Sequence, residues 1–187
     1  MALKATICKA NLRIADIDRG YYADHALTLA RHPSETDERM MVRLLAFAFH
    51  ATQALRFGAG LSTDDEPDVW CKDLTGTIEQ WIEVGLPDER RLRRACGRAQ
   101  SVIVYAYGGH TVGLWWKQVG KLLSKQHNLS VYQLDATQTR ALAAQADRTM
   151  QFDCNLQDGV LTLSQSALAQ HDPLPIERQV LQRAERD

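Results

Sequence analysis

The sequence lacks the markers of several common protein classes. Its four cysteines, at positions 8, 71, 96 and 154, form no Cys-x-x-Cys pair. Their spread favours reduced thiols in an intracellular protein over a zinc site or a disulfide framework. Neither sign of charge dominates, because the net charge is −1. This balance argues against a surface coated uniformly with basic residues for binding nucleic acid, although it permits a local basic patch.

Long apolar runs are also missing. Residues 1–18 contain no unbroken apolar stretch of the kind found in a signal peptide. The most apolar segment, MMVRLLAFAFHA, is interrupted by Arg43 and is too short to span a bilayer. We therefore expect a cytoplasmic protein that makes no use of a membrane.

Several catalytic signatures have no counterpart in the chain. There is no Gly-rich phosphate loop and no Gly-x-Ser-x-Gly nucleophile motif, and the six histidines show no metal-ligand spacing. These absences direct attention to the acidic residues.

The composition and the pattern of elements predict one α/β domain. A chain of 187 residues with 45% hydrophobic and 24% charged residues is typical of a globular protein with a sizeable core. The order hairpin, helix, hairpin, helix, strand, helix, strand, helix, hairpin predicts a mixed central sheet flanked by helices, with extra N- and C-terminal hairpins. The almost continuous apolar run SVIVYAY, residues 101–107, predicts a strand covered on both faces, and the last hairpin is expected to turn at Asp158-Gly159. We expect the domain to cover residues 1–165, followed by a polar tail, residues 166–187, that forms a short helix or is disordered.

The first hairpin and the first helix are strongly patterned. Apolar residues change phase after Ile7, which predicts a β-bulge near Lys9 or Ala10. A helix is expected from a Ser34 cap to a stop at Gly58. On it, Glu38 flanks the apolar stripe and is expected to face the body of the protein, whereas Glu35 is expected to be freer, favouring the positive helix N-terminus.

Residues 66–85, EPDVWCKDLTGTIEQWIEVG, hold two acids that a hairpin can bring together. Trp70, Trp81 and Ile82 are typical strand residues that would anchor this hairpin. Magnesium-dependent phosphodiester cleavage needs two or three converging carboxylates, and Asp68, Glu83 and the helical Glu38 fit these roles. The alternative is a solvated acidic turn in which the carboxylates only cap and solubilise the chain. Glu79 and Glu83 are four residues apart, so on a strand their side chains point to the same face, and either acid could point into a cleft.

Arginines and tryptophans farther along are candidates for contact with nucleic acid. Five arginines follow Asp88 on a predicted helix: Arg90, Arg91, Arg93, Arg94 and Arg98. They could meet phosphates, or they could form a solvated face balanced by Asp88 and Glu89. One of Trp115 and Trp116 is expected in the core, and the other could stack on bases.

Several blocks of the sequence resemble the YaeQ family of bacterial proteins. They are LARHPSETDERMMVRLLAF, DDEPDVW, WIEVGLPDERRLRRAC, LSVYQLD and ADRTMQFDCNLQDGVLTLS. That family is similar in fold to the PD-(D/E)XK, restriction-endonuclease-like nucleases. The resemblance implies that Asp68 and Glu83 are the motif acids and that Glu38 is the helix acid. Gly85 lies where the motif lysine belongs, so Lys72, Arg90 or Arg91 would have to supply the cation.

Two function hypotheses follow. The first is a nuclease or phosphodiesterase that uses Mg²⁺ or Mn²⁺ held by Asp68, Glu83 and Glu38. The second is a catalytically inactive nuclease-fold module with a regulatory role, which binds a protein partner or binds nucleic acid through basic residues. Those basic residues are Arg90, Arg91, Arg94, Arg98 and Lys72.

Overall fold

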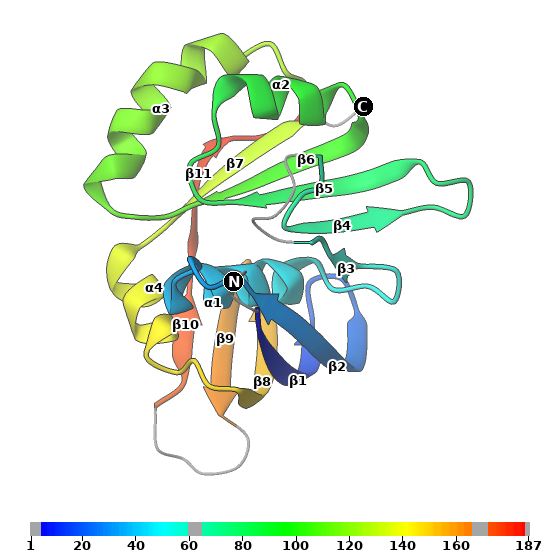
Figure 1. Cartoon of the computed structure of the whole chain (residues 1–187), viewed down its shortest axis with the longest axis vertical. Coiled ribbons are helices and arrows are strands. Elements are labelled where there is room, and N and C mark those ends of the chain that lie inside the picture. Colours follow the sequence, from blue (N-terminus) through cyan, green and yellow to red (C-terminus); the bar gives the residue numbers. More distant parts are fainter. Residues whose placement is uncertain (1–4, 60–64, 166–171, 186–187) are drawn as a thin grey trace. The chain divides into compact units, whose positions relative to one another are not determined.

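The structure of the chain is a computed structural model that describes residues 5–59, 65–165 and 172–185. It confirms the α/β class (Figure 1). The helices are α1 (Asp37–His50), α2 (Glu89–Cys96), α3 (His110–Leu123) and α4 (Ala136–Ala143). The strands are β1 (Thr6–Asp16), β2 (Tyr21–Arg31), β3 (Arg56–Phe57), β4 (Val69–Lys72), β5 (Ile78–Val84), β6 (Ala99–Ala106), β7 (Leu129–Leu134), β8 (Thr149–Gln157), β9 (Val160–Gln165), β10 (Leu174–Ile176) and β11 (Arg178–Gln182).

The strands form two mixed sheets, where the sequence predicted one central sheet. The first has the order β10-β9-β8-β1-β2, and the second has the order β11-β7-β6-β5-β4-β3. The chain divides accordingly into two compact units, residues 1–51 with 137–178 and residues 52–136 with 179–187. The N- and C-terminal hairpins are therefore not additions to a central sheet. They join through parallel pairing of β1 with β8 and build a sheet of their own.

The first sheet rests on regular alternation along β1. Its buried positions are Cys8, Ala10, Leu12 and Ile14, all on one face. The pairing of β1 with β2 is continuous from Thr6↔Arg31 to Asp16↔Tyr21, so the predicted bulge near Lys9 or Ala10 was wrong. The error came from counting Ile7 as buried, whereas it is 54% exposed. The other hairpin of this sheet turns at Asp158-Gly159 as predicted, with positive φ at both residues.

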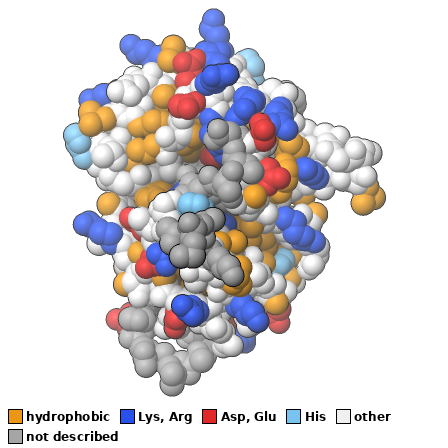
Figure 2. All heavy atoms as spheres, in the orientation of Figure 1, with side chains coloured by type: hydrophobic (Ala, Val, Ile, Leu, Met, Phe, Trp, Pro, Cys, Tyr) orange, Lys and Arg blue, Asp and Glu red, His pale blue; other side chains and the backbone are white. Residues whose placement is uncertain are grey.

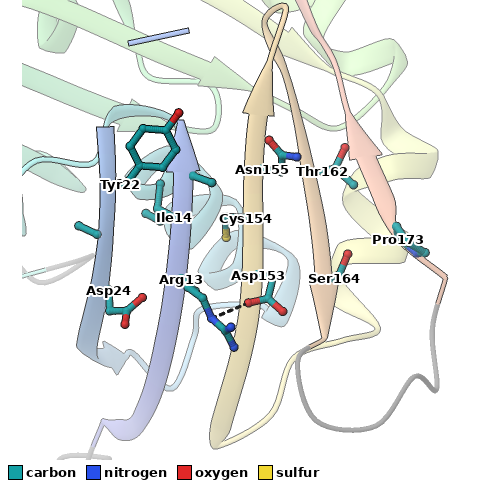
Figure 3. Close-up of a pocket in the computed structure, with 12 residues that line it drawn as sticks. Arg13, Ile14, Tyr22, Asp24, Asp153, Cys154, Asn155, Thr162, Ser164 and Pro173 are labelled. Atoms are coloured by element: carbon teal, nitrogen blue, oxygen red, sulfur yellow. Dashed lines mark ion pairs between the residues drawn. The ribbon is translucent and has the colours of Figure 1, made fainter. Parts of the chain in front are cut away.

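Residues of this sheet line a cavity of about 790 Å³. Figure 3 shows side chains from β1, β2, β8 and β9 along it, with Arg13 and Asp153 joined by an ion pair of 3.0 Å. Asp24 and the hydroxyls of Thr162 and Ser164 also line this cavity. Apolar side chains, among them Ile14 and Pro173, complete the lining, and its charged residues are of both signs.

Helix α1 is shorter than predicted and is buried on every side. Thr36, not Ser34, is its N-cap, because the Thr36 hydroxyl accepts the Arg39 N–H at 3.1 Å. The helix ends at His50, and the chain then enters β3 instead of continuing to Gly58. All ten residues from position 40 to position 49 are buried. Burial around the whole circumference of a helix is typical of a position inside a core.

The prediction for Glu35 was wrong, because this carboxylate is fully buried. Its Oε1 and Oε2 both lie 2.9 Å from Nη1 of Arg43, which is also buried, and Oε1 accepts a further bond from Arg39. Arg43 breaks the apolar run in the sequence, and its charge is neutralised here inside the core. A buried carboxylate held by two guanidinium groups is an internal ion pair rather than a cap.

The second sheet is covered on one face by α2 and α3 (Figure 1). Strand β6 is buried from Val102 to Ala106, as its continuous apolar run predicted. Leu92 and Ala95 of α2 and the apolar stripe of α3 pack against β5, β6 and β7 in one core. This packing sets the orientation of the β4–β5 hairpin and the start of α2, where the candidate site lies.

The C-terminal residues depart from the prediction of a short helix or a disordered tail. Residues 174–176 and 178–182 form β10 and β11, which pair with β9 and β7. Pattern alone missed them because each strand is short and pairs with a distant segment. Among the described residues, no helix is long and apolar enough to cross a bilayer.

The surface charge is mixed. On the face seen in Figure 2, Lys and Arg side chains are interspersed with Asp and Glu side chains. This agrees with the net charge of −1 and with the expectation that basic residues do not coat the protein uniformly.

Candidate acidic site on the β4–β5 hairpin

The hairpin predicted within residues 66–85 forms and brings Asp68 to the strand that carries Glu83. Strands β4 and β5 are antiparallel, with Val69 opposite Ile82. The Asp68 N–H donates to the Ile82 carbonyl at 3.1 Å, which continues the ladder by one residue. The Asp68 carboxylate in turn accepts the Val84 N–H through Oδ2 at 2.8 Å. Asp68 is thus locked at the end of β4, beside the end of β5.

Glu83 is the buried acid of β5. Both Asp68 and Glu83 are only 3% exposed. Oε1 of Glu83 accepts two hydrogen bonds, from the Trp81 indole at 2.7 Å and from Nε of Arg91 at 2.8 Å. Glu79, the alternative that the strand pattern left open, is exposed and accepts a contact from the Cys71 thiol at 3.3 Å. The structure therefore selects Glu83 as the inward-facing acid.

The two acids repel each other electrostatically. Burial raises the pKa of Glu83 above its ordinary value of 4.5, and the nearby Asp68 carboxylate raises it further. The Arg91 guanidinium and the Trp81 indole act in the opposite direction, since both donate to the charged form. The net shift is upward, so the desolvated acid pair is incompletely neutralised by its donors.

Arg91 is a cation in direct contact with this pair. Asp88 caps α2 by accepting the Arg91 N–H at 2.7 Å, which places Arg91 in the first turn of the helix. From there the side chain reaches the Glu83 carboxylate and the Glu66 carbonyl, both at 2.8 Å. One guanidinium therefore bridges the strand acid and the loop that leads into β4.

Gly85, which the resemblance places at the motif lysine, has a backbone that excludes an ordinary side chain. Its φ is +103°, a value that residues with a Cβ rarely adopt. A Cβ would meet nothing within 4 Å, so the restriction comes from the backbone and not from crowding. The Gly85 N–H donates to the Tyr105 carbonyl at 3.0 Å, which holds this conformation.

Glu38 belongs to the other compact unit and has a partner of its own there. The Thr139 hydroxyl donates to Oε1 of Glu38 at 2.6 Å and joins α4 to α1. Within the described ranges, no three His, Cys, Asp or Glu side chains are grouped so that they could hold a metal ion. The three-carboxylate set remains a prediction, and the contact that the structure describes joins Glu38 to Thr139.

The ligand types at the hairpin nevertheless fit a hard cation. Magnesium in phosphoryl-transfer sites is often held by one or two carboxylates together with phosphate oxygens and water. Asp68 and Glu83 supply two such carboxylates in a buried setting. The Arg91 ion pair opposes a metal, because its guanidinium already lies against Oε1 of Glu83.

Most of the remaining predicted basic residues have individual partners. Nζ of Lys72 lies 3.6 Å from the centroid of the Trp70 ring, while Arg94 and Arg98 are paired with Asp65. Arg90 is exposed on α2. Arg93 pairs with Glu89 and also donates to the Leu122 carbonyl at 2.8 Å. Much of this face is therefore engaged in local ion pairs, as the solvated-helix interpretation expected.

The structure also separates the two adjacent tryptophans. Trp115 is buried and its indole donates to the Pro87 carbonyl at 2.8 Å, so it is the core residue of the pair. Trp116 is half-buried and lines a cavity between α3 and the C-terminal strand β11.

Comparison with known proteins identifies the family. Residues 1–171 match the family model described as YaeQ protein. The chain belongs to the YaeQ family. It is 49% identical over 164 residues to the uncharacterized protein YaeQ of Escherichia coli (strain K12), and equally so to that of Salmonella typhi; each alignment covers 88% of this chain and 91% of the relative.

Solved structures of the family share this fold. The crystal structure of the YaeQ protein from Xanthomonas axonopodis pv. citri is 49% identical and superposes with a TM-score of 0.89, covering 95% of this chain and 98% of that one. The YaeQ protein from Pseudomonas syringae is 34% identical, with a TM-score of 0.90 and coverage of 96% and 97%. Neither these names nor those of the curated relatives assign an activity.

Sequence reasoning found the acids but did not single out two of their partners. Trp81 was interpreted only as an anchoring strand residue, although its indole donates to Glu83. Its position two residues before Glu83 on the same strand was the available signal, because such residues share a face. Arg91 was one of three candidates for the replacing cation, and only the packing of α2 beside β5 distinguishes it.

Proposed function

We propose that this YaeQ-family chain is a divalent-metal-dependent phosphodiesterase that acts on nucleic acid in the cytoplasm, through an atypical site of the PD-(D/E)XK type. The observation that carries the proposal is the buried pair of carboxylates on neighbouring strands, with Arg91 paired to one of them. Like charges side by side in a sheet destabilise it, so two buried acids are a costly arrangement unless a cation is bound.

Asp68 and Glu83 would hold one Mg²⁺ or Mn²⁺. Such an ion supplies a Lewis acid for the phosphate and lowers the pKa of a bound water. The protein holds its carboxylates ready by hydrogen bonding: the Val84 N–H orients Asp68, and the Trp81 indole orients Glu83. These donors reduce the reorganisation that ligand binding requires.

Arg91 takes the electrostatic part of the role of the motif lysine. With Glu83 engaged by the ion, the Arg91 guanidinium would be available to bind a phosphate oxygen and to stabilise the negative charge that develops there. An arginine stays protonated at ordinary pH, so Arg91 cannot accept a proton from the attacking water. The proton would leave through solvent or through the substrate phosphate, which predicts slow turnover.

Cleavage assays test the proposal directly. Purified protein is incubated with plasmid and with labelled oligonucleotides in Mg²⁺, Mn²⁺ or EDTA. We expect metal-dependent cleavage that is lost in Asp68→Asn and in Glu83→Gln and retained in Glu79→Gln, an exposed acid on the same strand. Equal products from the wild type and all three variants would exclude this site as the source of activity.

A second candidate function is favoured by two specific observations. Gly85 has a conformation that disfavours any side chain at the lysine position, and Arg91 already neutralises Glu83. Both suit a nuclease-fold module that binds nucleic acid, or a protein partner, without cleaving it. Binding of an oligonucleotide with no cleavage in any metal, and without loss of affinity in Asp68→Asn, would favour the module over the enzyme.

A further inference from the structure

The cavity beside Trp116 is about 730 Å³ and lies at the opposite edge of the second sheet from the acid pair. Helix α3 and the end of the chain after β11 form its walls. A volume of this size is within the range of pockets that bind small molecules or single nucleotides.

Trp116 is the tryptophan among the residues that line this groove. Gly120, one helical turn later, allows the ring to lie against the helix, because a Cβ at position 120 would stand only 2.9 Å from Cε2 of the ring. On its inner side the ring packs near Trp115, with centroids 5.7 Å apart. The half-buried Leu181 of β11 is a further lining residue that packs against the same core. Trp116 is thus held in place by the core while it borders the cavity.

The charged lining is mainly cationic. Lys117 and Lys121 lie one turn apart on α3, and Arg183 comes from the segment after β11. The acid of the lining, Glu185, is paired with His127 at 2.6 Å. The cavity on the first sheet differs, since there Arg13 is paired with Asp153 and Asp24 is a second acid.

Hydrogen bonds that involve backbone atoms connect the two walls of the groove. The Gln182 side chain donates to the carbonyls of Leu123 and Gln126, at 3.4 and 3.3 Å. The Glu185 N–H donates to the His127 carbonyl at 2.8 Å, and the Ala184 N–H donates to the Ser130 hydroxyl at 3.0 Å. These contacts hold the chain after β11 beside β7 and the end of α3, which gives the groove a defined shape.

We infer that this groove binds a single-stranded nucleic acid, with one base stacked on Trp116 and the adjoining phosphates on Lys117, Lys121 and Arg183. A flat aromatic face next to a row of cations is complementary to a base and its backbone, and an unpaired base is needed because duplex bases are already stacked. The inference deepens the proposed function and rests on it for the substrate class, because it restricts that substrate to single strands.

The test is fluorescence anisotropy with a labelled oligothymidylate in EDTA, where cleavage cannot occur. Because base stacking on an aromatic side chain contributes to the affinity, Trp116→Ala should weaken binding roughly 5- to 150-fold. Trp116→Phe keeps an aromatic ring and should retain most of the affinity. Lys117→Gln with Lys121→Gln should reduce the slope of log affinity against log salt by about 0.7 for each phosphate that the variant no longer neutralises. Lys125→Gln, which removes an exposed lysine outside the groove, is the matched control and should change neither quantity.

Each outcome decides the inference. Absence of binding by the wild type, or equal affinity of wild type, Trp116→Ala and the double lysine variant, would overturn it. Equal affinity for a duplex of the same length, or competition by dTMP at the same nucleotide concentration, would also overturn it, because the ligand would then not be a single strand.

Thermal melting verifies that each variant is folded, and the exposed lysine variants keep the test valid if Trp116→Ala unfolds. Trp116-dependent binding without cleavage in Mg²⁺ would support the groove while contradicting the phosphodiesterase.

Discussion

The Arg91 guanidinium lies 2.8 Å from Oε1 of Glu83, and this ion pair joins the start of α2 to the end of β5. The pair is largely shielded from solvent, since the side chains of Arg91 and Glu83 are 21% and 4% exposed. It is the contact that most directly limits the repulsion between Glu83 and Asp68.

Removing the Arg91 side chain should destabilise the protein. Deleting one partner of a buried ion pair lowers the free energy of unfolding by about 3–5 kcal/mol. Because Arg91 is partly exposed, we expect about 3 kcal/mol for Arg91→Ala. Urea denaturation measures the change. Arg90→Ala, an exposed arginine on the same helix, should change the free energy of unfolding by less than about 0.5 kcal/mol. Equal effects of the two variants would contradict a stabilising role for the ion pair.

Arg91→Ala should also strengthen the response to metal, because it removes a cation that competes for Glu83. We expect Mg²⁺ or Mn²⁺ to raise the melting temperature of Arg91→Ala more than that of the wild type. At a free metal concentration of 100 Kd, binding to the folded state adds about 2.7 kcal/mol. The double variant Asp68→Asn/Arg91→Ala should lose this response, and a metal shift that survives in it would assign the ion to another place.

The raised pKa of Glu83 predicts a pH-dependent stability difference. The folded chain retains the Glu83 proton at pH values where the unfolded chain, with a pKa near 4.5, has released it. The free energy of unfolding therefore falls as pH rises from 4.5 through the raised pKa. Glu83→Gln removes this slope, so its stability relative to the wild type should increase across that window and then level off.

Urea denaturation of both proteins between pH 4 and pH 8 measures this difference, with Glu79→Gln as the exposed control on the same strand. Parallel curves for wild type and Glu83→Gln would be inconsistent with a raised pKa. A relative stability of Glu83→Gln that decreases with pH would mean that the Arg91 ion pair outweighs burial.

Restoring the motif lysine should not restore a normal site. At φ +103° any residue with a Cβ is strained, so Gly85→Lys and Gly85→Ala should each lose about 1–3 kcal/mol of stability. Gly97→Ala is the matched control, because Gly97 has φ −78° and its added Cβ would make only ordinary contacts at 3.6 Å. Calorimetric melting compares the three variants. A Gly85→Lys protein as stable as the wild type would show that the backbone relaxes there.

The buried pair of Glu35 and Arg43 should be a coupled unit. Arg43→Met leaves the Glu35 carboxylate in the core with Arg39 as its remaining guanidinium partner, at a cost of about 3–5 kcal/mol. The double variant Glu35→Gln/Arg43→Met removes both charges and should recover part of that loss. A double-mutant cycle in urea gives the coupling energy, and a value near zero would mean that the two side chains act independently.

Local pattern predicted the elements in which neighbouring residues determine the structure. The Asp88 cap of α2, the Asp158-Gly159 turn and the buried run of β6 were readable because caps, turns and continuous apolar strands depend on residues a few positions apart. The α/β class and the β4–β5 hairpin with its two acids followed from the same short-range signals.

Tertiary structure decided what long-range pairing controls. The parallel pairing of β1 with β8 joins segments about 140 residues apart and makes two sheets out of the predicted one. It also decided which donors each acid meets. Glu35 has Arg39 and Arg43, Glu38 has Thr139, and Glu83 has Trp81 and Arg91. Sequence spacing identifies the residue types that can meet, whereas helix packing against a sheet fixes the distances between their atoms, and those distances decide the electrostatics of the site.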